Sequence, residues 1–88
     1  MKLVITGSYE EFLDYCREQG LYPHSRPKTV VFVDDYNDFF GFSGAELVCY
    51  GEYQKNPIYQ NEELWKFMLT YGKAKGWRMD DNLYRNSG

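Results

Sequence analysis

The 88-residue sequence predicts a small α/β domain, because short strand-like runs alternate with helical patterns. Three apolar runs, KLVIT (2–6), TVVFVD (29–34) and ELVCYG (46–51), have the length and composition of β-strands. The first two are continuously apolar and rich in β-branched residues, as expected for parallel strands that are covered on both faces. A helical pattern separates these two runs, and another follows the third. We therefore predict a parallel sheet between layers of helices.

The segment SYEEFLDYCREQG (8–20) predicts the first helix. Ser8 is a good N-cap, and Glu11 stands three residues later, which completes a capping-box pattern. Gly20 marks the end of the helix. Apolar residues recur at helical spacing and predict its buried side: Tyr9, Phe12, Leu13 and Cys16. The strand, helix and strand form a β-α-β unit, whose crossover is almost always right-handed.

The rest of the chain predicts two further helical segments. DYNDFFGFSGA (35–45) is too short for a full helix, so we expect one helical turn at residues 36–40 that ends at Gly41. Its apolar anchors would be Phe39, Phe40 and Phe42. A longer helix is expected from about Tyr59 or Asn61 to Lys75. Its predicted buried side consists of Leu64, Trp65, Met68, Leu69 and Tyr71, and Phe67 widens that stripe.

These elements assemble into one Rossmann-like, three-layer α/β domain over residues 1–80. The predicted sheet has three parallel strands in the order 2-1-3, with the first strand central. Two main helices and one short helical turn cover it. The chain ends in the polar segment MDDNLYRNSG (79–88), and we expect residues 81–88 to be a flexible tail.

Charge and composition exclude several classes of function. The formal net charge is −3, whereas a general nucleic-acid binder needs a basic face. No segment approaches the ~20 apolar residues of a membrane span, and acids interrupt the apolar start, so we expect neither a membrane span nor a signal peptide. Cys16 and Cys49 both lie in core patterns, which favours a reducing, cytoplasmic setting over a disulfide.

The candidate working surface is the sheet edge at the carboxyl ends of the strands, where open parallel sheets bind ligands. Aromatic residues make up 19% of the chain, and so small a core cannot bury all seventeen. Three tyrosines follow three different strands, and if they converge they form an aromatic centre with an acidic rim, which is typical of a protein-binding surface. Alternatively, each tyrosine packs over its own turn. The candidate binding residues are Thr6, Gly7, Ser8, Tyr9, Asp35, Tyr36, Gly51, Glu52 and Tyr53.

The segment TGSYEEF (6–12) has the order of a phosphate cradle, with a Gly-Ser turn before a helix. Glu10 and Glu11, however, occupy the first helical turn and satisfy the positive end of its dipole. The chain has no GxGxxG or GxxxxGK[ST] motif. A capped helix is therefore favoured over a phosphate site. The tyrosines could still stack on a base, which leaves a nucleotide-derived ligand as the alternative.

Enzymatic chemistry has little support in the sequence. Asp34, Asp35 and Asp38 follow the second strand, where Mg²⁺ ligands often lie, but their spacing fails the EF-hand pattern. An Asx-type turn that caps the short helix is favoured, and a metal at these residues stays open. His24 stands alone, and no Ser-His-Asp or Cys-His arrangement occurs at usable positions. We predict no catalytic residues and no cofactor.

Four motifs lie in order along the chain: SYEEFLDYCREQGLYP (8–23), VVFVDD (30–35), GFSGAELVCYGEY (41–53) and NP (56–57). In this order they resemble a group of small, mostly uncharacterised phage-encoded proteins over residues 2–57. The resemblance implies a viral accessory protein that inhibits a host defence or takes over a host process, and it implies no catalytic residues. The opening KLVITGS also resembles the start of nucleotide-binding Rossmann-type proteins, whose second glycine-rich motif is absent here.

The sequence thus predicts a non-enzymatic accessory protein that binds a host protein through an aromatic edge with an acidic rim and counteracts host defence. The alternative is a protein that binds or sequesters a small nucleotide-derived ligand. We expect it in the cytoplasm, which is the host cytoplasm if the protein is viral. Self-association stays open.

Overall fold

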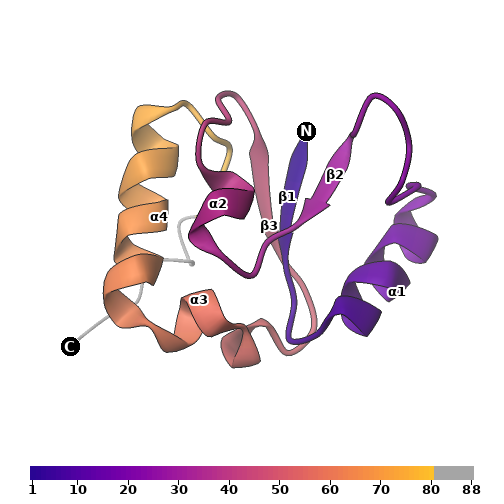
Figure 1. Cartoon of the computed structure of the whole chain (residues 1–88), viewed down its shortest axis with the longest axis horizontal. Helices are drawn as coiled ribbons and strands as arrows, with labels where there is room; N and C mark the ends of the chain where they lie inside the picture. Colours follow the sequence, from indigo (N-terminus) through magenta and orange to yellow (C-terminus); the bar gives the residue numbers. More distant parts are fainter. Residues whose placement is uncertain (81–88) are drawn as a thin grey trace.

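The computed structural model describes residues 1–80 and contains a three-stranded, all-parallel sheet (Figure 1). The strands are β1 (Lys2–Ile5), β2 (Val30–Phe32) and β3 (Glu46–Cys49). Their order is β2-β1-β3, so the first strand is central. The predicted α/β class, the parallel pairing and the strand order are confirmed. The tail expected at residues 81–88 lies outside the described residues.

Helices cover both faces of the sheet (Figure 1). The helix α1 (Tyr9–Gln19) lies on one face, and α2 (Tyr36–Phe39) and α4 (Glu62–Ala74) lie on the other. A 3₁₀ turn, η1 (Tyr53–Lys55), and the short helix α3 (Pro57–Gln60) lead from β3 to α4 along the carboxyl-end side of the sheet. The sheet is therefore the middle of three layers.

Two clusters of buried side chains fill the spaces between the layers. On β1, Leu3 and Ile5 point into one cluster and Val4 into the other, as the two-residue period of a strand requires. This double coverage explains why the strand is continuously apolar. The cluster under α2, α3 and α4 consists of Leu3, Ile5, Val33, Phe39, Ala45, Leu47, Ile58, Trp65, Met68, Leu69 and Trp77. The cluster under α1 consists of Val4, Phe12, Tyr15, Cys16 and Val30.

The first helix begins after Ser8 and ends before Gly20, as predicted. The Ser8 Oγ accepts a hydrogen bond from the Glu11 N–H (3.2 Å), and Gly20 ends the helix with a φ of 67°. Its buried stripe is shifted from the expected one, because Tyr15 is buried whereas Leu13 is only half-buried and Tyr9 is exposed. Positions 12, 15 and 16 also satisfy helical spacing, so the pattern alone did not decide the rotation of the helix.

The last predicted helix corresponds to α4, and the segment before it, expected as a loop, forms the short helix α3. Asn56 caps α3 and Asn61 caps α4, and the chain turns between them. After α4, Trp77 returns to the core, where its Nε1–H donates to the Phe42 C=O (2.8 Å). Arg78 then pairs with β3 in an isolated parallel bridge. Within residues 1–80, no helix is both long enough and apolar enough to cross a membrane.

Candidate functional site

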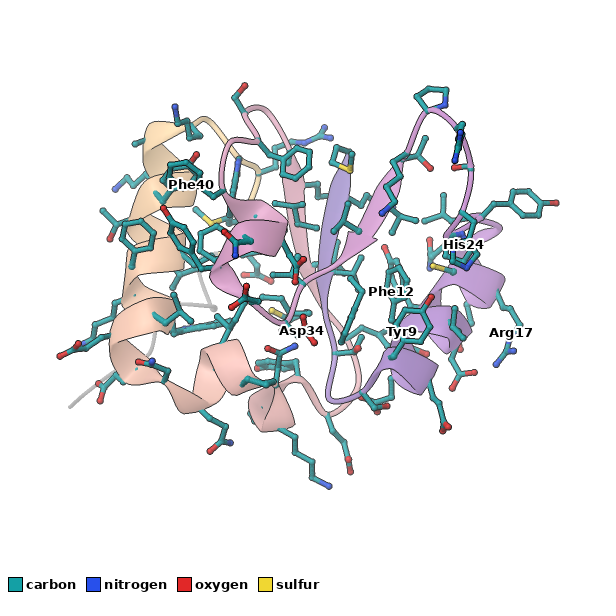
Figure 2. All side chains as sticks on the ribbon, viewed as in Figure 1. Tyr9, Phe12, Arg17, His24, Asp34 and Phe40 are labelled. Carbon is teal, nitrogen blue, oxygen red and sulfur yellow. The ribbon has the colours of Figure 1, made fainter. Side chains whose placement is uncertain are left out.

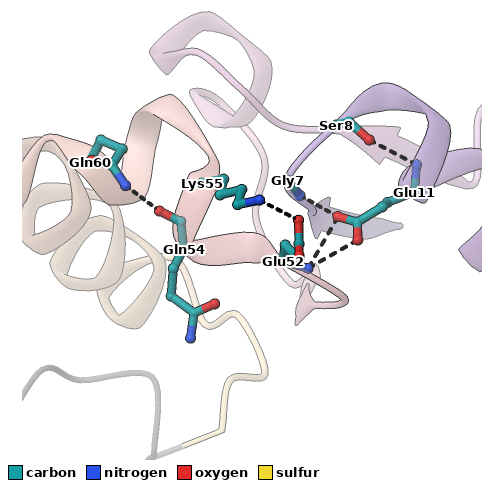
Figure 3. A network of polar contacts seen from close by, with 7 residues as sticks. All are labelled: Gly7, Ser8, Glu11, Glu52, Gln54, Lys55 and Gln60. Carbon is teal, nitrogen blue, oxygen red and sulfur yellow. Dashed lines mark hydrogen bonds and ion pairs between the residues drawn. The ribbon is translucent and has the colours of Figure 1, made fainter.

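The loops after β1 and β3 meet at the Glu11 carboxylate (Figure 3). The Gly7 N–H donates to Oε1 of Glu11 (2.8 Å), and the Glu52 N–H lies 3.1 Å from both Oε1 and Oε2. In the capping box expected from the sequence, this carboxylate would bond to the Ser8 N–H; instead it joins two loops. These backbone donors are the kind that a helix N-terminus offers to a phosphate. The Glu11 carboxylate therefore already takes N–H groups that an anionic ligand at this site would need.

Two glycines allow the loops to approach so closely. A Cβ on Gly7 would lie 2.5 Å from the carbonyl oxygen of Glu52, and one on Gly51 would lie 2.5 Å from Oε2 of Glu11. Gly51 also has a φ of 61°, which favours glycine. The candidate residues Gly7, Gly51 and Glu52 thus form a closed contact around one internal carboxylate.

Removing this carboxylate should loosen the contact. We expect Glu11→Ala to lower the free energy of unfolding by about 1–1.5 kcal/mol, because two backbone N–H groups lose a charged acceptor at a half-exposed site. Glu10→Ala is the matched control in the same helical turn, and its effect should stay within about 0.5 kcal/mol. Urea unfolding of both variants measures the difference. Equal losses would show that Glu11 does not hold the loops together.

Asn56 joins the ends of β1 and β2 beside this contact. Its Nδ2 donates to the C=O groups of Thr6 (2.9 Å) and Val33 (2.8 Å), and its Oδ1 accepts from the Ile58 N–H (2.9 Å). Asn56 and Thr6 are both fully buried. The Thr6 hydroxyl donates to the Ser8 C=O (2.5 Å), so its polar group is also satisfied internally. In the sequence, Asn56 carries no predicted role beyond the NP motif (56–57), although an Asn before a Pro at a helix start is a capping pattern.

The three aspartates after β2 form the start of α2. The Asp35 carboxylate accepts from the Asn37 N–H (3.3 Å), and Oδ2 of Asp38 accepts from the N–H groups of Asp34 (3.2 Å) and Asp35 (3.1 Å). This reciprocal capping matches the favoured sequence interpretation. Burial raises the pKa of Asp34, and its hydrogen bond to Asp38 and the charges of Asp38 and Asp35 raise it further. Across residues 1–80, no group of three or more His, Cys, Asp or Glu side chains could hold a metal ion.

The three candidate tyrosines pack against different neighbours. The Tyr9 ring lies 5.5 and 5.6 Å from rings of α1 and β2 (Figure 2). Tyr36 packs on the opposite face of the sheet, against rings of α2 and α4. Tyr53 packs edge-on against a tyrosine of α3, at 5.6 Å. The three rings therefore have separate neighbours, and those of Tyr9 and Tyr36 include rings of elements other than their own turns.

Two exposed and two half-buried rings lie together at α2 and α4, and we call them the aromatic surface: Tyr36, Phe40, Phe67 and Tyr71. Phe40 and Phe67 are 52% and 42% exposed. Tyr71 stacks on Phe40 (5.3 Å between centroids) and lies 5.8 Å from Phe67. Tyr36 lies 5.0 Å from Phe40 and 5.7 Å from Phe67. The four rings thus form one continuous contact network.

The surroundings hold these rings in place. The Tyr71 hydroxyl oxygen accepts from the Gly41 N–H (2.6 Å), and Lys75 Nζ lies 5.6 Å from the centre of the same ring. Beneath the surface, Phe39 and Trp77 connect it to the core. The helical pattern predicted Phe67 in a buried stripe, which is wrong, because its ring is 42% exposed. The high aromatic content of the chain was the one sequence signal for such a surface, because a core this small leaves some rings outside it.

The two cysteines are free thiols with raised pKa values. Burial raises the pKa of Cys16, and burial together with the charge of Asp80 raises that of Cys49 to about 12. A reactive cysteine needs an accessible thiolate, and both environments disfavour that form. Neither thiol is therefore activated as a nucleophile.

We compared the chain with known protein families, with curated proteins and with solved structures, and found no match. A functional proposal therefore rests on the geometry of the sites described above.

Proposed function

We propose that this chain is a non-enzymatic binding protein that recognises another protein through the aromatic surface. The observation that carries the proposal is the exposure of Phe40 and Phe67 in a network that fixes their positions. Aromatic side chains contribute large contact areas to protein interfaces, and rings that are already ordered lose little entropy on binding. A compact group of such rings has the character of a binding hot spot.

The charges at the Tyr36 end of the aromatic surface favour basic residues on the facing part of the partner, whereas Lys75 lies at the Tyr71 end. Asp34, Asp35 and Asp38 lie at the start of α2, next to Tyr36. Among residues 1–80, no lysine or arginine forms an ion pair with these three carboxylates. Basic groups around an apolar contact on the partner would therefore be steered toward this side. The proposal keeps Tyr36 and the acidic residues after β2 from the surface expected from the sequence, and it replaces Tyr9 and Tyr53 with Phe40, Phe67 and Tyr71.

The class of partner that we propose rests on the phage-protein resemblance alone, whereas the choice of surface rests on the geometry. That resemblance supports a host protein as the partner, met in the host cytoplasm, and interference with a host defence as the outcome of binding. A nucleotide-derived ligand is less well supported, because Glu11 takes the backbone N–H groups that a phosphate would use.

The test uses the immobilised chain to capture a partner from host-cell lysate, followed by affinity measurements with the purified partner. We expect Phe40→Ala and Phe67→Ala each to weaken binding by about 2 kcal/mol or more, because each removes an ordered ring from the hot spot. Circular dichroism of each variant confirms that the fold is retained.

Tyr9→Ala is the matched control, since Tyr9 is 44% exposed, close to the 42% of Phe67, but lies beside α1. It should leave the affinity unchanged. If Tyr9→Ala weakens binding as much as Phe67→Ala, or if neither phenylalanine matters, the aromatic surface is not the binding site.

A further inference from the structure

The aromatic surface leaves apolar rings in contact with water when no partner is bound. Phe40 and Phe67 are 52% and 42% exposed. The helix α4, which carries Phe67, buries its opposite side in the core through Trp65 and Met68. Groups of exposed apolar side chains are typical of interaction sites, because their contact with water is unfavourable. The free chain therefore gains stability from any molecule that covers these rings.

One row of side chains on α4 carries both rings of that helix between two opposite charges. Glu63, Phe67, Tyr71 and Lys75 are spaced four residues apart, so they follow one another along the same side of the helix. Rows with this spacing form the ridges through which helices of globular proteins most often pack against each other. Lys75 Nζ lies 5.6 Å from the centre of the Tyr71 ring, which places this charge beside the aromatic surface. The row reads acid, ring, ring, base.

The two charges at the ends of this row have no ion-pair partner in the described part of the chain. Glu63 and Lys75 are both exposed, and neither forms an ion pair within residues 1–80. Glu62, the neighbour of Glu63, is by contrast paired with Lys66 (3.4 Å). An opposite charge on another molecule can therefore pair with either end of the row without breaking an ion pair of the fold.

The row on α4 is complementary to its own reverse. Its midpoint is Leu69, from which Phe67 and Tyr71 are each two positions away and Glu63 and Lys75 are each six. Suppose that α4 of a second copy lies antiparallel on the first, about a two-fold axis at the level of Leu69. Phe67 of each copy then faces Tyr71 of the other, and Glu63 of each copy faces Lys75 of the other. Such a contact has rings at its centre and opposite charges at both ends.

We propose that two copies of this chain associate through the aromatic surface with their α4 helices antiparallel, and that the second copy masks this surface until the partner displaces it. A second copy is the occupant because the row on α4 complements itself, and because a two-fold contact closes after two copies. The masking rests on the function proposed above, since it requires the partner to bind the same rings, whereas the dimer itself does not. At low concentration the chain is monomeric, which leaves the surface free for the partner.

Sedimentation equilibrium of the purified full chain at increasing concentration should reveal a monomer–dimer equilibrium. Glu63→Lys and Lys75→Glu each place like charges opposite one another at both ends of the contact. Each should raise the dimer dissociation constant about tenfold or more, and the effect should shrink at higher salt concentration. Glu10→Lys is the matched control, because it makes the same charge change in the first turn of α1, on the other face of the sheet (Figure 1). It should leave the constant unchanged.

Mixing the two charge-reversal variants gives the sharpest result. A Glu63→Lys chain and a Lys75→Glu chain restore opposite charges at both ends of the contact, so the mixture should form heterodimers with near-native affinity. This rescue also shows that each variant is folded. A native chain that stays monomeric at every concentration would overturn the proposal. A dimer that neither charge reversal weakens, or a mixture that does not recover, would overturn it as well.

The dimer measurement uses the purified chain alone, so its failure is distinct from that of the proposed function. If the chain stays monomeric while Phe67→Ala still weakens partner binding, only the self-association is wrong. If the dimer forms as expected, the apparent affinity of the chain for its purified partner should fall as the chain concentration rises through the dimer range. An apparent affinity that does not change with chain concentration would show that the second copy does not mask the aromatic surface.

Discussion

Asn56→Ala is expected to lower the free energy of unfolding by about 3 kcal/mol or more, the largest loss that we expect from any single polar residue. Its amide donates to two strand-end carbonyls, those of Thr6 and Val33, and its Oδ1 caps α3. The substitution leaves both carbonyl oxygens buried without a donor, and each such group costs about 1–3 kcal/mol. Urea unfolding at a fixed temperature measures the loss.

Asn61→Ala provides the matched control for this prediction. Asn61 also caps a helix, through the Leu64 N–H (3.2 Å), but it is exposed and joins no strands. Asn61→Ala should lower the free energy of unfolding by about 1 kcal/mol, the usual cost of removing an N-cap. If the two alanine variants are equally stable, the Asn56 amide does not hold β1 and β2 together at their carboxyl ends.

Gly72→Ala should destabilise the domain by about 2–3 kcal/mol, because the packing at this site has no room for a methyl group. In an open helix the same change stabilises by about 1 kcal/mol, since alanine is the better helix former. Here a Cβ would lie 2.2 Å from Cε3 of the Trp77 ring. Thermal and urea unfolding should both report the loss.

A double-mutant cycle separates this clash from a general effect on α4. Trp77→Leu removes the ring that the new methyl group would meet, so Gly72→Ala should cost much less in that background. If the cost of Gly72→Ala is the same with leucine at position 77, contact with Trp77 is not its cause.

The sheet and the first helix were predictable because their signals are local. The β-branched runs around Val4 and Val31 indicate strands that are covered on both faces, and Ser8 and Gly20 mark the ends of α1. The bridge between Arg78 and β3 has no such signal, because it joins residues more than thirty positions apart. The helix α3 was missed because Asn56 and Pro57 were taken as part of a loop.

The candidate site was predicted only in part. The two glutamates of the first helical turn favoured a capped helix over a phosphate site, and the structure adds that Glu11 reaches a loop 41 residues away. The neighbours of each tyrosine depend on how α1, α2 and α4 are rotated against the sheet. A helical pattern does not determine that rotation to within one residue, so the exposure of Phe40 and Phe67 could not be derived from it.

Photo-crosslinking shows whether the aromatic surface contacts the partner. A photoreactive phenylalanine derivative is placed at position 67 in one chain and at position 9 in another, two sites of nearly equal exposure (42% and 44%). Both chains are irradiated in host-cell lysate, and the adducts are compared by mass. We expect a single protein adduct from position 67 and none from position 9. An adduct from position 9 without one from position 67 would contradict contact through the aromatic surface.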